Sequence, residues 1–266
     1  MVLVADLVYL LISLCCAIPS AASIVYFSCF MWNGLDLPIG IDGHADWHTP
    51  PLLTSSTLLH NALLLLIFPV QHTFTLRGPL DTLLRLMVPE HYRRPVYSLS
   101  AGLALGLTMY LWQPMPQPVW TISNTIAANI VLAVSLIGFL GAPIAINNMD
   151  PFGLNIYGVR KPLLKLLGWE SGGGPLGEAG LVETGMYGFV RNPQYSMLMV
   201  GIWITPTMSV GHLLLTSVYT LYVILAVKYS EEPALVREMG KAYTDYMDRT
   251  PPYIPALTKH NKSKRT

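Results

Sequence analysis

The chain has 266 residues, of which 52% are hydrophobic and only 12% are charged. Soluble domains carry about 25% charged residues, so this composition is typical of a membrane protein. A mean hydropathy of +0.46 agrees with that class. The net charge of +1 gives no basis for a nucleic-acid partner. The cysteines lie close together in the first apolar segment without a C-x-x-C pair, which argues against a disulfide framework or a metal site; they are Cys15, Cys16 and Cys29.

Several segments are long and apolar enough to cross a bilayer, for which about 20 residues are needed. The first resembles a signal peptide near Ala21, but no basic residues precede it, so we expect a retained helix. The last two are separated by a turn of only a few residues, which predicts a helical hairpin. The predicted fold is therefore all-α, a polytopic membrane helical bundle of about six spans: 3–31, 52–71, 95–112, 126–147, 194–208 and 211–230.

The distribution of basic residues predicts the orientation of this bundle. With a cytoplasmic N-terminus, the loops 33–51 and 113–125 lie outside and contain no Lys or Arg. The loops 72–94 and 148–193 and the C-terminal tail then lie inside and carry the basic residues, as the positive-inside rule requires. These include Arg77, Arg85, Arg93, Arg94, Arg160, Lys161, Lys165, Arg191, Arg237, Lys241 and Arg249.

Two features of the C-terminal half concern local structure. Gly172, Gly174 and Gly177 form a G-x-G-x-x-G pattern, but no strand precedes it, so a flexible linker is a better account than a dinucleotide site. Pro233 predicts that the last span ends there and that a new helix runs over 233–248, because proline suits a first helical turn. Its periodicity is that of an amphipathic helix on the cytoplasmic membrane surface, with tyrosines at the headgroup level.

Two motifs near the C-terminus resemble those of the isoprenylcysteine carboxyl methyltransferase superfamily. The segment 184–195, TGMYGFVRNPQY, resembles the box TGLYrxVRHPxY, and the pair Glu231-Glu232 followed by GKAYTDY at 240–246 resembles the closing pattern of that superfamily. Further elements are similar to those of bacterial methanethiol S-methyltransferases and the related nurim group. They are FPVQH at 68–72, WQPMP at 112–116, INNMDPFGL at 146–154 and PTMSVGH at 206–212.

The resemblance divides the chain into an N-terminal four-helix membrane region, 1–147, and a methyltransferase region, 148–266. It covers about residues 60–255. Asn192 and Asn148 stand where the family motifs have histidines. Asparagine keeps hydrogen-bonding capacity but does not titrate, so an acid–base role at either position would be lost.

The resemblance implies methyl transfer from S-adenosylmethionine (AdoMet), used as a co-substrate. A guanidinium can hold its carboxylate, carboxylates can hold its ammonium or ribose, and tyrosines can stack on adenine or face the sulfonium. Catalytic roles are expected for His72, Arg191 and Asn192. Residues expected to bind AdoMet are Tyr187, Arg191, Asn192, Pro193, Tyr195, Glu231, Glu232, Tyr243 and Tyr246.

The methyl acceptor that the resemblance favours is a small thiol such as methanethiol, with His72 as a candidate base or, alternatively, a structural residue at the membrane boundary. The alternatives are a lipid or isoprenylcysteine substrate and a non-catalytic nurim-like protein. A sterol-reductase relative that uses NADPH is disfavoured, because such chains usually carry more spans. The site would face the cytoplasm. The ending KSKRT at 262–266 resembles an endoplasmic reticulum retrieval signal, which predicts that membrane for a eukaryotic source and the cell membrane for a bacterial one.

Overall fold

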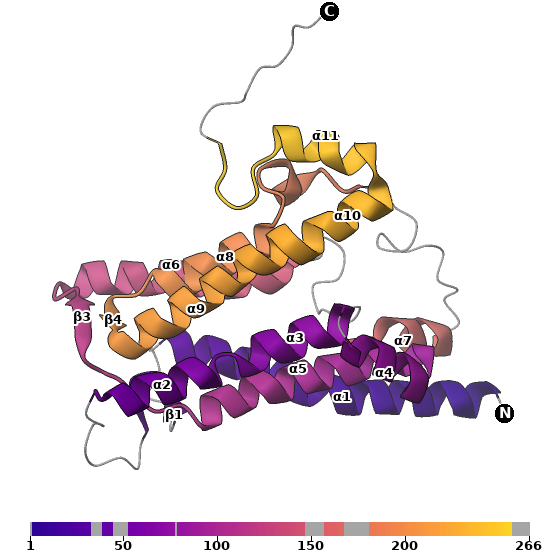
Figure 1. Ribbon diagram of the computed structural model, residues 1–266, viewed down its shortest axis with the longest axis horizontal. Coiled ribbons are helices and arrows are strands. Elements are labelled where there is room, and N and C mark those ends of the chain that lie inside the picture. The colour runs from indigo at the N-terminus through magenta and orange to yellow at the C-terminus, as the bar shows by residue number, and fades with distance from the viewer. Residues whose placement is uncertain are drawn as a thin grey trace, which may run out of the picture.

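The computed structural model describes residues 2–32, 39–44, 53–77, 79–146, 157–167 and 181–256. These residues are mostly helical, and Figure 1 shows their helices in two layers with α11 against the outer end of α10. The first layer contains α1 (Val2–Trp32), α2 (Ser55–Leu64), α3 (Ile67–Arg77), α4 (Pro79–Met87), α5 (Glu90–Tyr110) and α7 (Arg160–Leu166). The second contains α6 (Thr125–Ile146), α8 (Pro193–Trp203), α9 (Val210–Ala226), α10 (Glu232–Met239) and α11 (Lys241–Arg249).

Four helical stretches of the described chain are long and apolar enough to span a membrane: Val4–Trp32, Ser55–Thr75, Thr125–Ala145 and Val210–Met239. The protein is therefore a multi-pass membrane protein. The two remaining predicted spans are helical in part, as α5 and α8. Helix α5 begins at Glu90 and carries charged residues in its first turns, and α8 has only 11 residues, about 16 Å of helix.

Close contacts between small residues hold the helices of each layer together. Helix α1 packs along α5, and α6 packs along α8. A side chain at Gly138 would lie 2.3 Å from the backbone nitrogen of Gly201, so only glycine permits this approach of α6 to α8. The Ser135 hydroxyl donates to the Gly201 carbonyl over 2.7 Å at the same crossing. These contacts fix α8, and with it the motif that precedes α8.

The two layers share one apolar core near the end of the bundle that carries the strands. Its largest fully buried side chains include Phe30, Leu65, Trp112 and Leu215. Two short antiparallel pairs cover this end, β1 (Ile39–Gly40) with β2 (Gly43–His44), and β3 (Pro118–Thr121) with β4 (Thr207–Ser209). The predicted hairpin of α8 and α9 is present (Figure 1). Strand β4 lies in its turn, which the sequence did not predict.

The predicted helix boundary at Pro233 is wrong. Helix α9 continues through a π-turn, η2 (Val227–Glu231), directly into α10, so the helix is continuous as far as Met239. The π-turn widens the register, and the Glu232 amide donates to the carbonyl of Val227, five residues back. Pro233 then occupies the first turn of α10, where its ring and missing N–H are tolerated.

The chain turns at Gly240 instead. This residue has φ +57°, a conformation that favours glycine, and it divides the predicted helix over 233–248 into α10 and α11. Helix α11 consequently folds back over the turn that precedes α8 (Figure 1). The predictions for Asn148, for the glycine-rich stretch around Gly174 and for the tail 262–266 lie outside the described residues.

Candidate active site

The motif at 184–195 forms a compact turn ahead of α8. Gly185 has φ +62° and opens a 3₁₀ turn, η1 (Gly185–Gly188), and Pro193 is among the first residues of α8. Between these elements the backbone is irregular. The Arg191 amide donates to the carbonyl of Pro251 over 2.8 Å, and the Asn192 amide donates to that of Pro252 over 3.0 Å. The C-terminal segment after α11 therefore runs beside the motif and holds it through main-chain bonds.

Arg191 is the centre of this arrangement. Its Nε and Nη2 contact Oε1 of Glu232 at 2.8 and 2.6 Å, and both side chains are about nine-tenths buried. Its Nη1 donates to the carbonyls of Met247 and Thr250, at 3.1 and 2.5 Å. One guanidinium thus joins the motif, the start of α10, the end of α11 and the segment that follows. We call this group of contacts the C-terminal clasp.

Three tyrosines complete the clasp. Tyr243 and Tyr246 on α11 are 3% and 2% exposed, and their rings meet edge to face with centroids 5.8 Å apart. The Tyr246 hydroxyl donates to the carbonyl of Tyr187 over 2.7 Å. Tyr243 and Tyr246 therefore face inward onto the motif, and the headgroup position that periodicity favoured for them is wrong.

Burial keeps these phenols neutral. It raises the pKa of Tyr243 to about 12, with the carboxylate of Glu232 acting in the same direction and Arg191 against it. Burial also raises the pKa of Tyr187, and that of Tyr246 with a contribution from Tyr243. In the physiological range the clasp thus offers neutral hydroxyls and ring faces around one ion pair.

The second glutamate of the pair points elsewhere. Tyr195, in the first turn of α8, donates to Oε1 of Glu231 over 2.7 Å. The π-turn ends at Glu231, so the two adjacent glutamates serve different neighbours, Glu232 in the clasp and Glu231 beside α8. Asn192 caps the start of α8 with its backbone, and its Nδ2 donates to the carbonyl of Pro252 at 3.3 Å.

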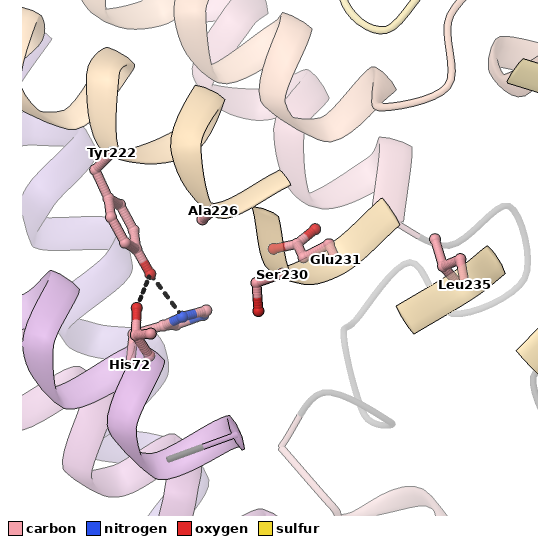
Figure 2. A pocket seen from close by; sticks show the side chains of 7 residues that line it. His72, Tyr222, Ala226, Ser230, Glu231 and Leu235 are labelled. Atoms are coloured by element: carbon pink, nitrogen blue, oxygen red, sulfur yellow. Dashed lines mark hydrogen bonds between the residues drawn. The ribbon is translucent and has the colours of Figure 1, made fainter. Parts of the chain in front are cut away.

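Glu231 also lines a pocket of about 220 Å³ between α3, α9, the π-turn and α10. His72, predicted from the sequence, lies in the opposite wall (Figure 2). The Tyr222 hydroxyl lies 2.8 Å from Nδ1 of His72. The remaining lining residues are Thr73, Ala226, Ser230 and Leu235.

The predicted site residues thus fall into two neighbouring groups that share one contact. The clasp contains Arg191, Asn192, Glu232 and the tyrosines of η1 and α11, whereas the pocket contains His72 and Glu231. The Tyr195–Glu231 hydrogen bond connects the groups. Sequence reasoning missed Tyr222, which belongs to no quoted motif. Tyr222, Ala226 and Ser230 follow one another at intervals of four residues. This spacing could have indicated that they share a helix face.

Comparison with known proteins places these features in a family. The family model described as phospholipid methyltransferase matches residues 165–242, which include the motif and the glutamate pair. Methanethiol S-methyltransferase 2 of Bradyrhizobium diazoefficiens is 31% identical over 207 residues, which cover 78% of this chain and 76% of that protein. No solved structure gives a significant match.

Other curated relatives extend the similarity over nearly the whole chain. Methanethiol S-methyltransferase of a Pseudomonas species is 27% identical across 96% of this chain and 92% of its own length. The protein of that name from Mycobacterium tuberculosis is 30% identical, covering 75% and 79%. The multi-pass helical fold, the match over the motif region and this extent of identity show that the chain belongs to the family of membrane methyltransferases that includes the methanethiol S-methyltransferases.

Proposed function

We propose that this methyltransferase transfers the methyl group of AdoMet to the sulfur of a small thiol such as methanethiol, giving a volatile thioether. The observation that carries the proposal is the pocket that joins His72 to Glu231. Its volume of about 220 Å³ is below the roughly 300–1,000 Å³ of sites for drug-sized ligands. Relatives named methanethiol S-methyltransferase support the same substrate.

The groups around the clasp fit the chemistry of AdoMet. AdoMet supplies an electrophilic methyl group on a sulfonium. The Glu231 carboxylate, already an acceptor for Tyr195, suits its ammonium or ribose hydroxyls. The partly exposed ring of Tyr187 suits adenine or the sulfonium, and the buried Tyr243 and Tyr246 support it from behind. These features support a donor site beside the pocket.

In this proposal, existing hydrogen bonds limit how Arg191 can contact AdoMet. Glu232 and two carbonyls engage its three nitrogens. A carboxylate of AdoMet would reach the guanidinium only by displacing one of these partners. We propose that Arg191 and Glu232 shape the donor site and that Asn192 and Pro193 fix the start of α8 against it.

His72 is the proposed base. Sulfur attacks as a thiolate, and free thiols have a pKa near ~8.5, so removal of the proton at neutral pH assists the reaction. An imidazole in the wall of the acceptor pocket is placed for that task. Neutralisation of thiolate against sulfonium in a pocket partly lined by apolar side chains would favour the step.

A lipid acceptor is the second candidate, because the matching family model is described as phospholipid methyltransferase. The pocket is small, and it is lined by the polar groups of His72, Tyr222 and Glu231. Both properties disfavour a large apolar chain in this space. The discriminating experiment offers purified protein labelled AdoMet with a panel of small thiols and, separately, phospholipid and isoprenylcysteine acceptors. Labelled thioether supports the proposal, and labelled lipid without thioether would replace it.

We further propose six spans with both termini and the site in the cytoplasm. Helix α8 supplies about 16 Å of its membrane crossing, and the residues 204–209 that follow it, which include strand β4, would supply the rest. Pairing of β3 with β4 supplies partners for this non-helical backbone, as the membrane requires. The membrane is that of the endoplasmic reticulum for a eukaryotic source and the cell membrane for a bacterial one.

A further inference from the structure

We propose that Tyr222 is a positioning residue that holds the proton of neutral His72 on Nδ1 and so makes Nε2 the proton acceptor for the thiol. This inference rests on the proposed function, and it concerns a residue outside every motif quoted for the family resemblance. It starts from a contact between two helices that are distant in the sequence, α3 and α9.

The Tyr222 hydroxyl has two neighbours. It lies 2.8 Å from Nδ1 of His72 and 3.4 Å from Oγ1 of Thr73, the next residue of α3. Figure 2 shows the tyrosine reaching from α9 to the histidine at the edge of the pocket, with Ser230 and Glu231 on the other side. The 2.8 Å contact is a good hydrogen bond in which either atom can donate, whereas the 3.4 Å contact is weak.

Two assignments fit these neighbours, because either hydroxyl can donate in the contact between Tyr222 and Thr73. If Nδ1–H donates to the Tyr222 oxygen, the tyrosine proton can be donated to Thr73, and both hydroxyl functions are used. In that tautomer Nε2 carries a lone pair. If Tyr222 instead donated to Nδ1, the neutral ring would carry its proton on Nε2 and could not accept another there. His72 can act as the base only in the first tautomer, so the proposed function selects it and makes Tyr222 the acceptor for Nδ1–H.

Tyr97 and Glu231 also lie near the imidazole. The ring of Tyr97 on α5 packs edge-on against His72, with centroids 5.8 Å apart, and Arg94 and Glu231 both act electrostatically on Tyr97. Glu231 lines the same pocket as His72. Once His72 is protonated, Nδ1–H still donates to Tyr222, so the same contact stabilises the product of proton transfer.

The proposed step balances as follows. The S–H bond of the thiol breaks, and its proton goes to Nε2 of His72. The sulfur electron pair forms a bond to the methyl carbon of AdoMet while the bond from that carbon to the sulfonium breaks, and its electrons stay on the departing S-adenosylhomocysteine. The imidazolium then releases one proton to water. The products are the methyl thioether, S-adenosylhomocysteine and a proton.

The first test replaces Tyr222 with Phe, which keeps the ring and removes the oxygen. We expect kcat/KM for the thiol to fall about tenfold while AdoMet binding is unchanged. Because the imidazolium loses an acceptor, the midpoint of the pH–rate profile should move to lower pH. Tyr97→Phe is the matched control: its ring also packs edge-on against His72, and its profile should remain that of the wild type. An unchanged rate and midpoint in Tyr222→Phe would overturn the inference.

A double-mutant cycle shows whether Tyr222 acts through His72. In a His72→Asn background, Tyr222→Phe should cause no further loss, whereas additive losses would mean that Tyr222 only shapes the pocket, and the inference would be wrong. Nitrogen NMR of labelled histidine reads the tautomer directly, with His72→Asn assigning the signal. A proton on Nε2 in the wild type would also overturn the inference. This measurement needs no turnover, so a wild-type protein that methylates no thiol would refute the proposed function separately.

Discussion

Arg191 and Glu232, 41 residues apart in the sequence, form an ion pair with Nη2 and Oε1 separated by 2.6 Å, and both side chains are almost fully buried. A buried pair of this kind is costly to break from one side, because the remaining charge loses its partner without regaining water. The pair lies where the motif, α10 and the segment after α11 meet. It therefore couples the stability of the C-terminal clasp to the shape of the proposed AdoMet site.

Replacing Arg191 with Ala should destabilise the protein by about 3–5 kcal/mol, the usual cost of leaving one buried charge unpaired. Thermal unfolding in detergent, with limited proteolysis after α10, measures the effect. The matched control is Lys241→Ala at the ion pair with Asp245, where the lysine side chain is 84% exposed and the expected loss is below about 1 kcal/mol. Equal unfolding temperatures for the two variants would contradict the clasp.

How far the sequence could predict this site depends on what kind of atom makes each contact. Motif residues with chemically distinctive side chains, such as Arg191 and the glutamate pair, were identified from the sequence, and the structure brings them together. The partners of Arg191 at Met247 and Thr250 are backbone carbonyls, which leave no mark on the sequence. The sequence therefore did not identify the segment after α11 as part of the site.

The fold shows a similar division. Hydrophobic length located the main spans, because a bilayer imposes a fixed thickness. It did not locate the break between α10 and α11, since the effects of Pro233 after a π-turn and of Gly240 depend on local register rather than on hydropathy. The sequence did not identify Tyr222, because a tyrosine on an apolar helix does not indicate which residue of another helix it contacts.

Gly240→Ala tests the break directly. A methyl group at Gly240 would meet no atom within 4 Å, so any loss comes from the backbone at φ +57° and not from a clash. We expect destabilisation of about 1 kcal/mol and a shift of α11, seen as weaker protection of Tyr246 in hydrogen exchange. Gly106→Ala, in the middle of α5 with an ordinary contact at 3.4 Å, is the control and should be neutral or slightly stabilising. A neutral Gly240→Ala would show that the turn tolerates a side chain.

Alkaline pH should loosen the clasp before the membrane helices unfold. The ordinary tyrosine pKa is ~10, and that of Tyr243 in the folded protein is about 12. The folded state binds this proton more tightly, so the stabilisation is complete below pH ~10 and is lost as the pH rises toward 12. Phenolate absorbance and proteolysis after α10 should change together in that window. Tyr243→Phe should retain the clasp to higher pH, and simultaneous loss in both proteins would assign the transition to other groups.

Cysteine labelling tests the proposed orientation. In a cysteine-free background, a single cysteine at Ser123, between β3 and α6, should react with an impermeant maleimide from outside. One at Thr244 on α11 should react only after permeabilisation. Both positions are exposed, so burial does not explain a difference between them. Labelling of Thr244→Cys in intact cells would reverse the orientation and move the site to the other side of the membrane.

Asn192, where the family motif has histidine, gives the last prediction. Its side-chain nitrogen donates to the carbonyl of Pro252 at 3.3 Å, and its backbone amide donates to the same oxygen at 3.0 Å. A histidine N–H can make this bond equally well, so Asn192→His should change turnover little and add no titration near pH ~6.5. Asn192→Ala should cost about 0.5–1.5 kcal/mol of stability, because the backbone bond still satisfies Pro252.

Turnover, AdoMet binding and thermal unfolding of the two Asn192 variants separate a hydrogen-bonding role from acid–base chemistry. If the position only secures the segment after α11 against the start of α8, stability changes in Asn192→Ala and the pH–rate profile changes in neither variant. A large gain in rate with a new pH dependence in Asn192→His would show that the family histidine transfers a proton. Asparagine would then limit this enzyme, and His72 would not be its sufficient base.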